Sequence, residues 1–398
     1  MGARDKRRLP VQQEMQMLAA AAPLISRSSS STPTPRSAFA SYLVDTDDDW
    51  AAALEDTPRC QIDVDATAAE IGALTAQIGR ADRFSRLLKA PTVDLQALRA
   101  LAWSGVPPEL RPVVWPVLLG HAPTETAKRT STLAARRQEY YAGIAQALRG
   151  GCDSAVWHQI HIDVLRTHPT IALYQKETTK RALERILYLW AIRHPESGYV
   201  QGINDLATPF FQVFLSAYTN DADVQHFDPA GLPKGIIDVV EADTFWCLSS
   251  LLATLSDHYI HGQPGIQRQI TSLRDLTRRI DTRLASHLEH QGVEFIQFSF
   301  RWMNCLLMRE FNVRSTIRMW DTYLSEGSTG FSQFHLYVCA AFLVKWSKKL
   351  LQMDFQSILM FLQSLPTKSW TEKDIELLLS EAFMWQSLYA DDKLMKCR

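Results

Sequence analysis

The sequence has no excess of charge of either sign: its 398 residues include 42 Lys and Arg against 43 Asp and Glu. Proteins that grip nucleic acid through its phosphates need a clustered basic excess, so we expect no nucleic-acid partner. No run of about 18 consecutive apolar residues occurs, and we therefore expect no transmembrane segment. The apolar stretch at 18–25 is broken by Pro23 and lacks the cleavage pattern of a signal peptide.

Cysteine pairs and cofactor motifs are missing as well. The six cysteines stand singly without a C-x-x-C spacing, which favours reduced, buried thiols and a cytosolic compartment. No G-x-x-x-x-G-K-[ST], G-x-G-x-x-G or G-x-S-x-G segment occurs. The pairs His158/His161 and His287/His290 have an i, i+3 spacing, but without an H-E-x-x-H pattern they fit solvated or capping histidines better than metal ligands. We expect no cofactor and no metal of the protein's own.

Residues 1–80 differ in composition from the rest of the chain. The stretch 28–37 is rich in Ser, Thr and Pro. Such a segment cannot bury enough apolar surface to offset the entropy of ordering, so we predict a disordered tail. The spacing Arg27-x-x-x-Ser31-x-Pro33 loosely resembles a 14-3-3 docking site that phosphorylation would create. The alternative is an unregulated linker, which composition alone favours.

From Phe84 onward the chain shows helical periodicity. Asp94 precedes a run of helix formers and is expected to be an N-cap, and apolar residues in 181–193 recur at i, i+3, i+4 and i+7. No alternating strand pattern or hairpin signal occurs, so we predict an all-α fold. Further helices are expected after a capping Asp243, over 293–311 as a central buried helix, over 334–346 and over 375–385.

Proline and glycine indicate where these helices end. Pro116 and Pro209, among other prolines, are expected near segment ends. A stretch rich in Asp, Gly and Pro over 220–234 is expected to be a loop that divides the helical region into two lobes.

The segment Ile160-His-Ile-Asp163-Val-Leu-Arg166 places an acid three residues before an arginine. On a helix these two side chains share a face, so the carboxylate could hold the guanidinium extended. Taken alone, the segment is better explained as an ordinary surface ion pair.

The segment Tyr199-Val-Gln201-Gly202 follows, with Gln201 35 residues after Arg166. Gly198 and Gly202 bracket the glutamine, and glycine permits a backbone bend and the close approach of a partner. Taken alone, this segment could equally be a turn.

Further segments accompany these two in a fixed order. Gly105-Val-Pro-Pro-Glu-Leu-Arg-Pro-Val-Val-Trp115 precedes them, and Phe300-Arg-Trp-Met-Asn304 and Arg318-Met-Trp-Asp321 follow. Together, the patterns G-[IV]-P-x-x-x-R-x-x-x-W, I-x-x-D-x-x-R, Y-x-Q-G, R-W and W-D resemble the TBC-domain family of Rab GTPase-activating proteins. The similarity covers about 84–390. Three stretches are similar to the member-22 branch of that family: 185–195, 263–267 and 335–341.

The resemblance implies a two-lobed, all-helical TBC domain over 81–390, with a signature core at 105–327, behind the tail at 1–80. It implies that the chain stimulates GTP hydrolysis by a Rab-family GTPase, which carries the GTP and Mg²⁺. Because such GTPases are membrane-anchored, it also implies a cytoplasmic protein recruited to the Golgi or other endomembranes.

By resemblance, Arg166 is an arginine finger and Gln201 a glutamine finger, supported by Asp163, Tyr199 and Gly202. A guanidinium inserted in trans stabilises the charge that spreads over the phosphoryl oxygens, which accelerates hydrolysis by about 10³ to 10⁵. Lysine substitutes poorly because the planar fork spans two oxygens. A carboxamide can orient the attacking water through one donor and one acceptor.

Two alternatives to a GTPase activator remain. The first is a TBC scaffold that binds a Rab or a Golgi adaptor with little or no turnover. The second is an unrelated helical adaptor, in which Arg166 and Gln201 would lie far apart or be buried.

Other conspicuous residues are expected to be structural. Trp115, Trp302 and Trp320 should fill the core. Arg111 and Asp321 should satisfy buried backbone groups or each other rather than touch a GTPase.

Overall fold

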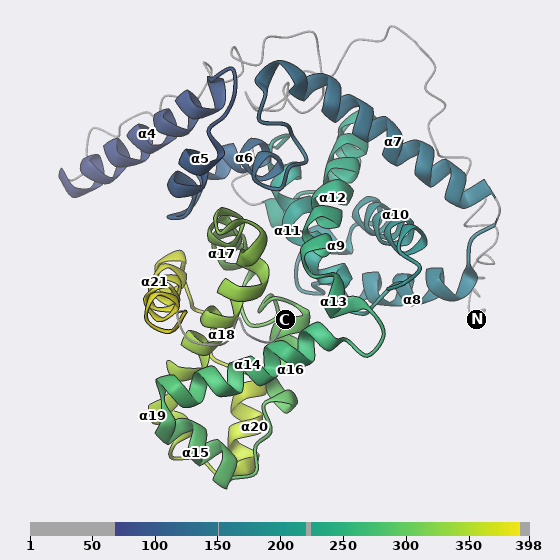
Figure 1. The fold of residues 1–398 in the computed structure, drawn as a ribbon. Coiled ribbons are helices and arrows are strands. Elements are labelled where there is room, and N and C mark those ends of the chain that lie inside the picture. Colours follow the sequence, from purple (N-terminus) through teal and green to yellow (C-terminus); the bar gives the residue numbers. More distant parts are fainter. Residues whose placement is uncertain (1–67, 150, 220–223, 391–398) are drawn as a thin grey trace, which may run out of the picture.

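The computed structural model describes residues 68–149, 151–219 and 224–390, and these residues form an all-helical fold (Figure 1). In the described part of the chain, extended pairing is confined to an isolated bridge between Thr92 and Glu125. The first helices are α4 (Ala68–Lys89), α5 (Leu95–Ala102), α6 (Arg111–Leu118), α7 (Arg129–Arg149), α8 (Ser154–Leu165), α9 (Ala172–Gln175), α10 (Glu177–Arg193), α11 (Ile203–Ser216), α12 (Lys234–Thr254) and α13 (Ser256–Tyr259). The later helices are α14 (Pro264–Ile280), α15 (Thr282–His290), α16 (Ile296–Asn304), α17 (Val313–Ser325), α18 (His335–Val344), α19 (Ser347–Leu350), α20 (Phe355–Gln363) and α21 (Glu372–Tyr389).

Figure 1 shows two groups of helices, one from α5 to α13 and the other from α14 onward. Helix α17 joins them, since it packs against α5, α6 and α11 as well as α21. The stretch expected to be a dividing loop, 220–234, lies partly outside the described residues, and its described part does not divide the groups. Helix α12 after it packs on α7, α10 and α11 before it. The chain passes between the groups later, after α13.

Helix α4 begins at Ala68, so helical structure starts earlier than the expected boundary at residue 81. The proposed 14-3-3 docking segment at 27–33 lies outside the described residues. Asp94 caps α5 as predicted, accepting hydrogen bonds from the backbone N–H groups of Gln96 and Ala97 at 2.9 and 3.0 Å.

The prediction that Asp243 caps a helix is wrong. Helix α12 starts nine residues earlier, at Lys234, and Asp243 lies in its buried middle. Its carboxylate accepts hydrogen bonds from Arg137 at 2.8 and 3.0 Å and lies 3.1 Å from His121 Nε2. Burial alone would raise the pKa of Asp243, but Arg137 and His121 outweigh burial and lower this pKa. Asp243, whose polarity suggested a helix start, therefore forms an ion pair that joins α12 to α7.

The predicted helix over 293–311 is also wrong in its second half, because α16 ends at Asn304. Leu306 and Leu307 follow with φ of +49° and +60°, a left-handed conformation that usually selects glycine. Leu307 N–H bonds to the carbonyl of Trp302 at 3.1 Å, as in a Schellman helix end. Both leucine side chains are fully buried, so packing stabilises a backbone that their sequence does not suggest.

Pro116 and Pro209 lie inside α6 and α11 and do not end them as expected. A proline in a helix leaves the carbonyl four residues earlier without its usual donor. In α11 that carbonyl belongs to Asp205, and the Thr208 hydroxyl donates to it at 2.7 Å. The helix therefore tolerates Pro209 without an unpaired buried group.

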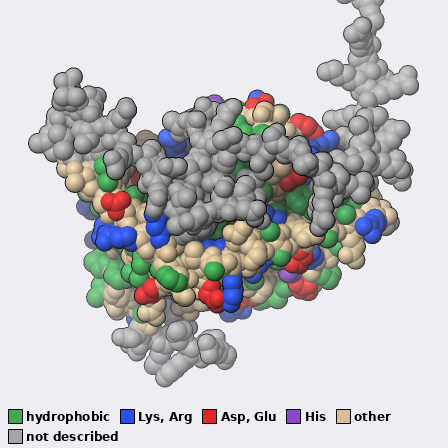
Figure 2. All heavy atoms as spheres, turned by 90° about the horizontal axis from the view of Figure 1, so that it is seen from above, with side chains coloured by type: hydrophobic (Ala, Val, Ile, Leu, Met, Phe, Trp, Pro, Cys, Tyr) green, Lys and Arg blue, Asp and Glu red, His purple; other side chains and the backbone are tan. Residues whose placement is uncertain are grey.

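The described surface carries charges of both signs side by side. On the face seen from above in Figure 2, Lys and Arg side chains and Asp and Glu side chains are scattered among hydrophobic and uncharged surface where the described residues are visible. None of the described helices is long and apolar enough to cross a membrane. Among the described cysteines, Cys247, Cys305 and Cys339 are free and buried as predicted, and Cys152 is half-buried.

Asp321 connects three segments of the core. Its buried carboxylate accepts hydrogen bonds from Arg111 Nη2 at 3.0 Å, Trp115 Nε1 at 2.8 Å and the Val106 backbone N–H at 3.0 Å. The expectation that Arg111 and Asp321 pair with each other is confirmed. The three tryptophans expected in the core are fully buried: Trp115, Trp302 and Trp320.

Replacing Asp321 by Ala should lower the free energy of unfolding by about 3–5 kcal/mol, because it leaves a buried guanidinium without its counter-ion. Urea denaturation measures this loss. Asp275→Ala serves as control, since Asp275 is half-exposed and pairs with the adjacent Arg274; removing such a pair costs about 0–1 kcal/mol. Equal losses in the two variants would contradict the role of Asp321.

Candidate functional site

Helix α8 positions Asp163 and Arg166 at its C-terminal end. Asp153 caps the start of α8, accepting from the backbone N–H groups of Ala155 and Val156. Asp163 lies on the inner face and is fully buried, whereas Arg166 is the C-cap residue with its side chain 51% exposed. Arg166 Nη2 donates to Asp163 Oδ1 at 2.5 Å. The acid thus holds one edge of the guanidinium while the rest faces solvent.

The segment before α11 brings Gln201 to the same place. Tyr199 OH donates to Asp163 Oδ2 at 2.8 Å, so one carboxylate receives both Tyr199 and Arg166. Gln201 itself is exposed. Gly202, at the N-cap of α11, has a φ of +110°, which turns the chain sharply into the helix.

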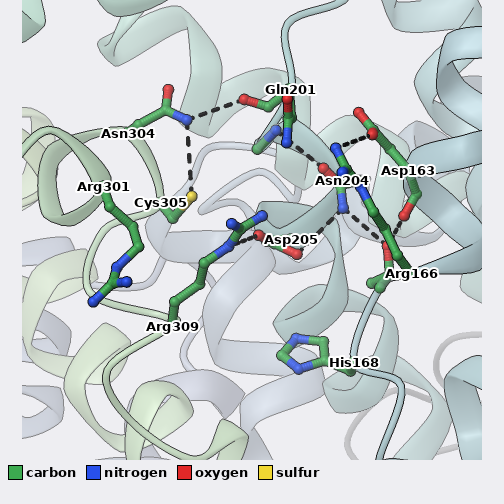
Figure 3. Close-up of polar contacts among 12 residues, drawn as sticks. Asp163, Arg166, His168, Gln201, Asn204, Asp205, Arg301, Asn304, Cys305 and Arg309 are labelled. Atoms are coloured by element: carbon green, nitrogen blue, oxygen red, sulfur yellow. Dashed lines mark hydrogen bonds and ion pairs between the residues drawn. The ribbon is translucent and has the colours of Figure 1, made fainter. Parts of the chain in front are cut away.

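Asn204 connects these two segments below the surface. Its Oδ1 accepts from the Gly202 backbone N–H at 3.0 Å, and its Nδ2 donates to Thr167 Oγ1 at 2.9 Å. Thr167 in turn donates to the Asp163 carbonyl at 2.8 Å. Asp163, Arg166, Tyr199 and Gly202 are therefore linked through Asn204 and one another by hydrogen bonds. Figure 3 shows Gln201 beside Asn204, Asp163 and Arg166. If the chain were an unrelated helical adaptor with an accidental motif match, Arg166 and Gln201 would lie far apart or be buried. Neither is the case.

Tyr199 stays a donor because of its surroundings. Burial, followed by the charge of Asp163, raises the pKa of the Tyr199 phenol. At neutral pH it is therefore protonated and donates to Asp163. This donor gives Asp163 a partner that does not depend on Arg166.

A groove with a volume of about 640 Å³ opens beside Arg166, between α8, α11 and the segment after α16. Arg309 lines it, with a side chain 43% exposed, and its Nε donates to Asp205 Oδ2 at 2.8 Å. Burial opposes the charge of Arg309, but Asp205 outweighs burial and raises the pKa of Arg309. His168 lines the same groove, and burial lowers its pKa, so it is neutral at pH 7.

Sequence reasoning missed Asn204, Asp205 and Arg309. Asn204 and Asp205 follow Gly202 after a single residue, and they could have been suspected as polar residues in the apolar start of a helix. Arg309 carries no local signal, because the turn at Leu306 and Leu307 that brings it to the groove has no glycine.

Within the described residues no group of three or more His, Cys, Asp or Glu side chains is arranged to hold a metal ion. His161 Nδ1 lies 2.7 Å from Glu184 Oε1, and His287 Nε2 lies 3.0 Å from the Met353 carbonyl. Each of these histidines thus has a protein partner. That GTP and Mg²⁺ are carried by a partner stays a prediction.

Gly202→Ala should lower the free energy of unfolding by about 1–3 kcal/mol, because an alanine at this φ is strained. In addition, its Cβ would lie 2.5 Å from Asn304 Nδ2. Gly198→Ala is the matched control: Gly198 also has a positive φ, +61°, but open space around its Cβ position. Thermal or urea denaturation should show the larger loss for Gly202→Ala. If Gly198→Ala costs as much, close packing at Gly202 is not what requires glycine.

Comparison with known proteins identifies the family to which the chain belongs. The model of the Rab-GTPase-TBC domain matches residues 108–351. The GTPase-activating protein gyp1 of Schizosaccharomyces pombe is 57% identical over 326 residues, which are 81% of this chain and 63% of that protein. Human TBC1 domain family member 22B is 49% identical over 316 residues, 78% of this chain and 62% of that protein. The chain thus spans less than two thirds of the length of these relatives.

Solved structures of other proteins have the same fold. The crystal structure of the Ypt/Rab-GAP domain of Gyp1p has 53% identity and a TM-score of 0.76, and the match covers 78% of this chain and 99% of that one. The TBC domain of a Chlamydomonas flagellar RabGAP shares the fold at 19% identity, with a TM-score of 0.56 over 79% of this chain and 92% of that one. The helical fold, the motif cluster and these matches together show that the chain belongs to the TBC-domain family of Rab GTPase-activating proteins, in the branch of Gyp1 and TBC1 domain family member 22.

Proposed function

We propose that this protein accelerates GTP hydrolysis by a Rab-family GTPase, to which it supplies Arg166 and Gln201 in trans. The observation that carries the proposal is the exposure of both side chains above one buried carboxylate, Asp163, beside an open groove. The names of the relatives, a GTPase-activating protein and a Ypt/Rab-GAP domain, support the same activity.

The chemistry requires a group that stabilises the transition-state charge and a group that orients the attacking water. Water attacks the γ-phosphorus in line, the bond to the β–γ bridging oxygen breaks, and negative charge spreads over the phosphoryl oxygens. The Arg166 guanidinium would stabilise this charge. The Gln201 carboxamide oxygen would accept a hydrogen bond from the attacking water and so fix the direction of its attack. GTP and Mg²⁺ belong to the partner in this mechanism.

The resting cluster is suited to releasing Arg166. In the free protein the guanidinium is held on Asp163, which reduces the entropy that ordering a long side chain would cost on docking. When Arg166 turns toward a phosphate, Asp163 still accepts from Tyr199 at 2.8 Å and lies 3.4 Å from Gln159 Nε2. The buried carboxylate therefore keeps partners in both states.

The proposal includes where the protein acts. Rab-family GTPases are membrane-anchored, so we place this protein in the cytoplasm, recruited to the Golgi or other endomembranes, where it would regulate vesicle trafficking. We also propose that phosphorylation of the segment at 27–33 would create a binding site for a 14-3-3 protein.

The alternative is a scaffold that binds a Rab or a Golgi adaptor and has lost turnover. The presence of both finger residues on one exposed surface favours the activator. Binding without acceleration across a panel of Rabs would instead favour the scaffold.

Arg166→Ala should reduce stimulated hydrolysis by about 10² or more, and Gln201→Ala by a similar or somewhat smaller factor. Arg166→Lys should restore little, because an ammonium lacks the planar fork. The measurement is single-turnover GTP hydrolysis by a panel of purified Rab GTPases with each variant.

Arg274→Ala is the control for loss of an exposed arginine. The Arg274 side chain is 52% exposed, close to the 51% of Arg166, and it lies on α14 away from the groove. The Arg274→Ala variant should stimulate hydrolysis as strongly as the wild type. If Arg166→Ala unfolds the protein, Arg166 is a structural member of an ion pair and the finger assignment fails.

A further inference from the structure

Asn304, the last residue of α16, contacts the backbone of the proposed glutamine finger. Its Nδ2 donates to the Gln201 carbonyl oxygen at 3.0 Å across 103 residues of sequence. The residue is 7% exposed, and Figure 3 shows it on the side of Gln201 opposite to Asp163. Gln201 is therefore held between the two groups of helices.

Gly202, the residue after Gln201, also packs closely against the end of α16. A Cβ on Gly202 would lie 2.5 Å from Asn304 Nδ2 and 3.3 Å from Cys305 Sγ. The peptide between Gln201 and Gly202 thus lies directly against the end of α16, and only a residue without a side chain fits there.

The Asn304 side chain is not the best choice for stability alone. Its Oδ1 is buried and is one of the atoms in the described residues without a hydrogen-bond partner. Leaving a buried carbonyl oxygen unpaired costs about 1–3 kcal/mol, which an apolar side chain would avoid. A polar residue that is unfavourable for folding and touches a functional segment indicates a role at that segment.

The segment carrying Asn304 is rigid for reasons independent of Gln201. After α16 the chain turns through the buried residues Leu306 and Leu307. Arg301 forms an ion pair with Glu310 at 2.6 Å, and Arg309 pairs with Asp205 at 2.8 Å. Asn304 therefore provides a fixed point from which the Gln201 backbone can be held.

We infer that Asn304 is a positioning residue for Gln201: it fixes the Gln201 main chain so that the carboxamide meets the attacking water in one geometry. This inference rests on the proposed function. Without the hydrogen bond, residues 199–202 remain tied to Asp163 through Tyr199, but the Gln201 carbonyl loses its link to α16. Because catalytic groups must be held within a fraction of an ångström, this loss should appear in the rate and not in binding.

The test is a double-mutant cycle between Asn304→Leu and Gln201→Ala, measured by single-turnover GTP hydrolysis on the Rab that the panel identifies. Leucine matches the branched shape of asparagine and lacks the donor. Asn304→Leu should lower the maximal rate about tenfold, within the ~10²-fold that a misplacement of about 1 Å can cost. The half-saturating concentration should stay within about twofold. In the Gln201→Ala background the same change should have no further effect.

Two controls separate positioning from folding. Gln297→Ala alters an exposed side chain on the same helix and should leave the rate unchanged. Asn304→Ala, which adds no new atoms near Gly202, should repeat the loss seen with Asn304→Leu while both variants keep a wild-type melting temperature within a few degrees.

The outcomes are distinct. Equal losses from Asn304→Leu with and without Gln201, or no loss at all, would overturn the positioning role. A wild-type protein that accelerates no Rab, or one that Gln201→Ala leaves unaffected, would instead refute the proposed function or the glutamine's part in it.

Discussion

The site depends on one buried carboxylate. Asp163 has no exposed surface, and it receives Arg166 on one oxygen and Tyr199 on the other. A buried charge is tolerated only when paired and hydrogen-bonded, so the two motif segments must stay together for Asp163 to remain buried. The folding requirement of one acid thus holds the two exposed side chains, Arg166 and Gln201, at fixed places near each other.

Helix ends rather than helix interiors form this surface. Arg166 is the C-cap of α8, Gly202 is the N-cap of α11, and Asn304 is the last residue of α16. At a helix end the backbone can change direction, and side chains are free of the regular helical face. Three helices that pack through apolar side chains thereby bring their ends to one site, where polar groups can meet a partner without disturbing the core.

The two proposed catalytic side chains are supported from different sides. Arg166 is held by Asp163, on its own helix, whereas Gln201 is held by Tyr199 through Asp163 and by Asn304 from the later group of helices. The position of Gln201 therefore depends on how the two groups of helices are placed relative to each other, and the position of Arg166 depends on this less. Under the proposed function, this second support should affect the rate of hydrolysis rather than the binding of a GTPase.

The sequence by itself determined the all-α class, the cap at Asp94 and the buried tryptophans, because helical periodicity and apolar patterning are local properties. The site residues were expected only from the resemblance of several motifs, in order, to a family. Only the tertiary structure decided that Asp243 forms an ion pair from inside α12, that α16 ends at Asn304, that Arg309 lines the groove and that Asn304 contacts the Gln201 backbone. Each of these depends on partners over 60 residues away or on burial that makes leucine adopt a glycine-like backbone. Such effects arise from packing between distant segments, and no local pattern of residues encodes them.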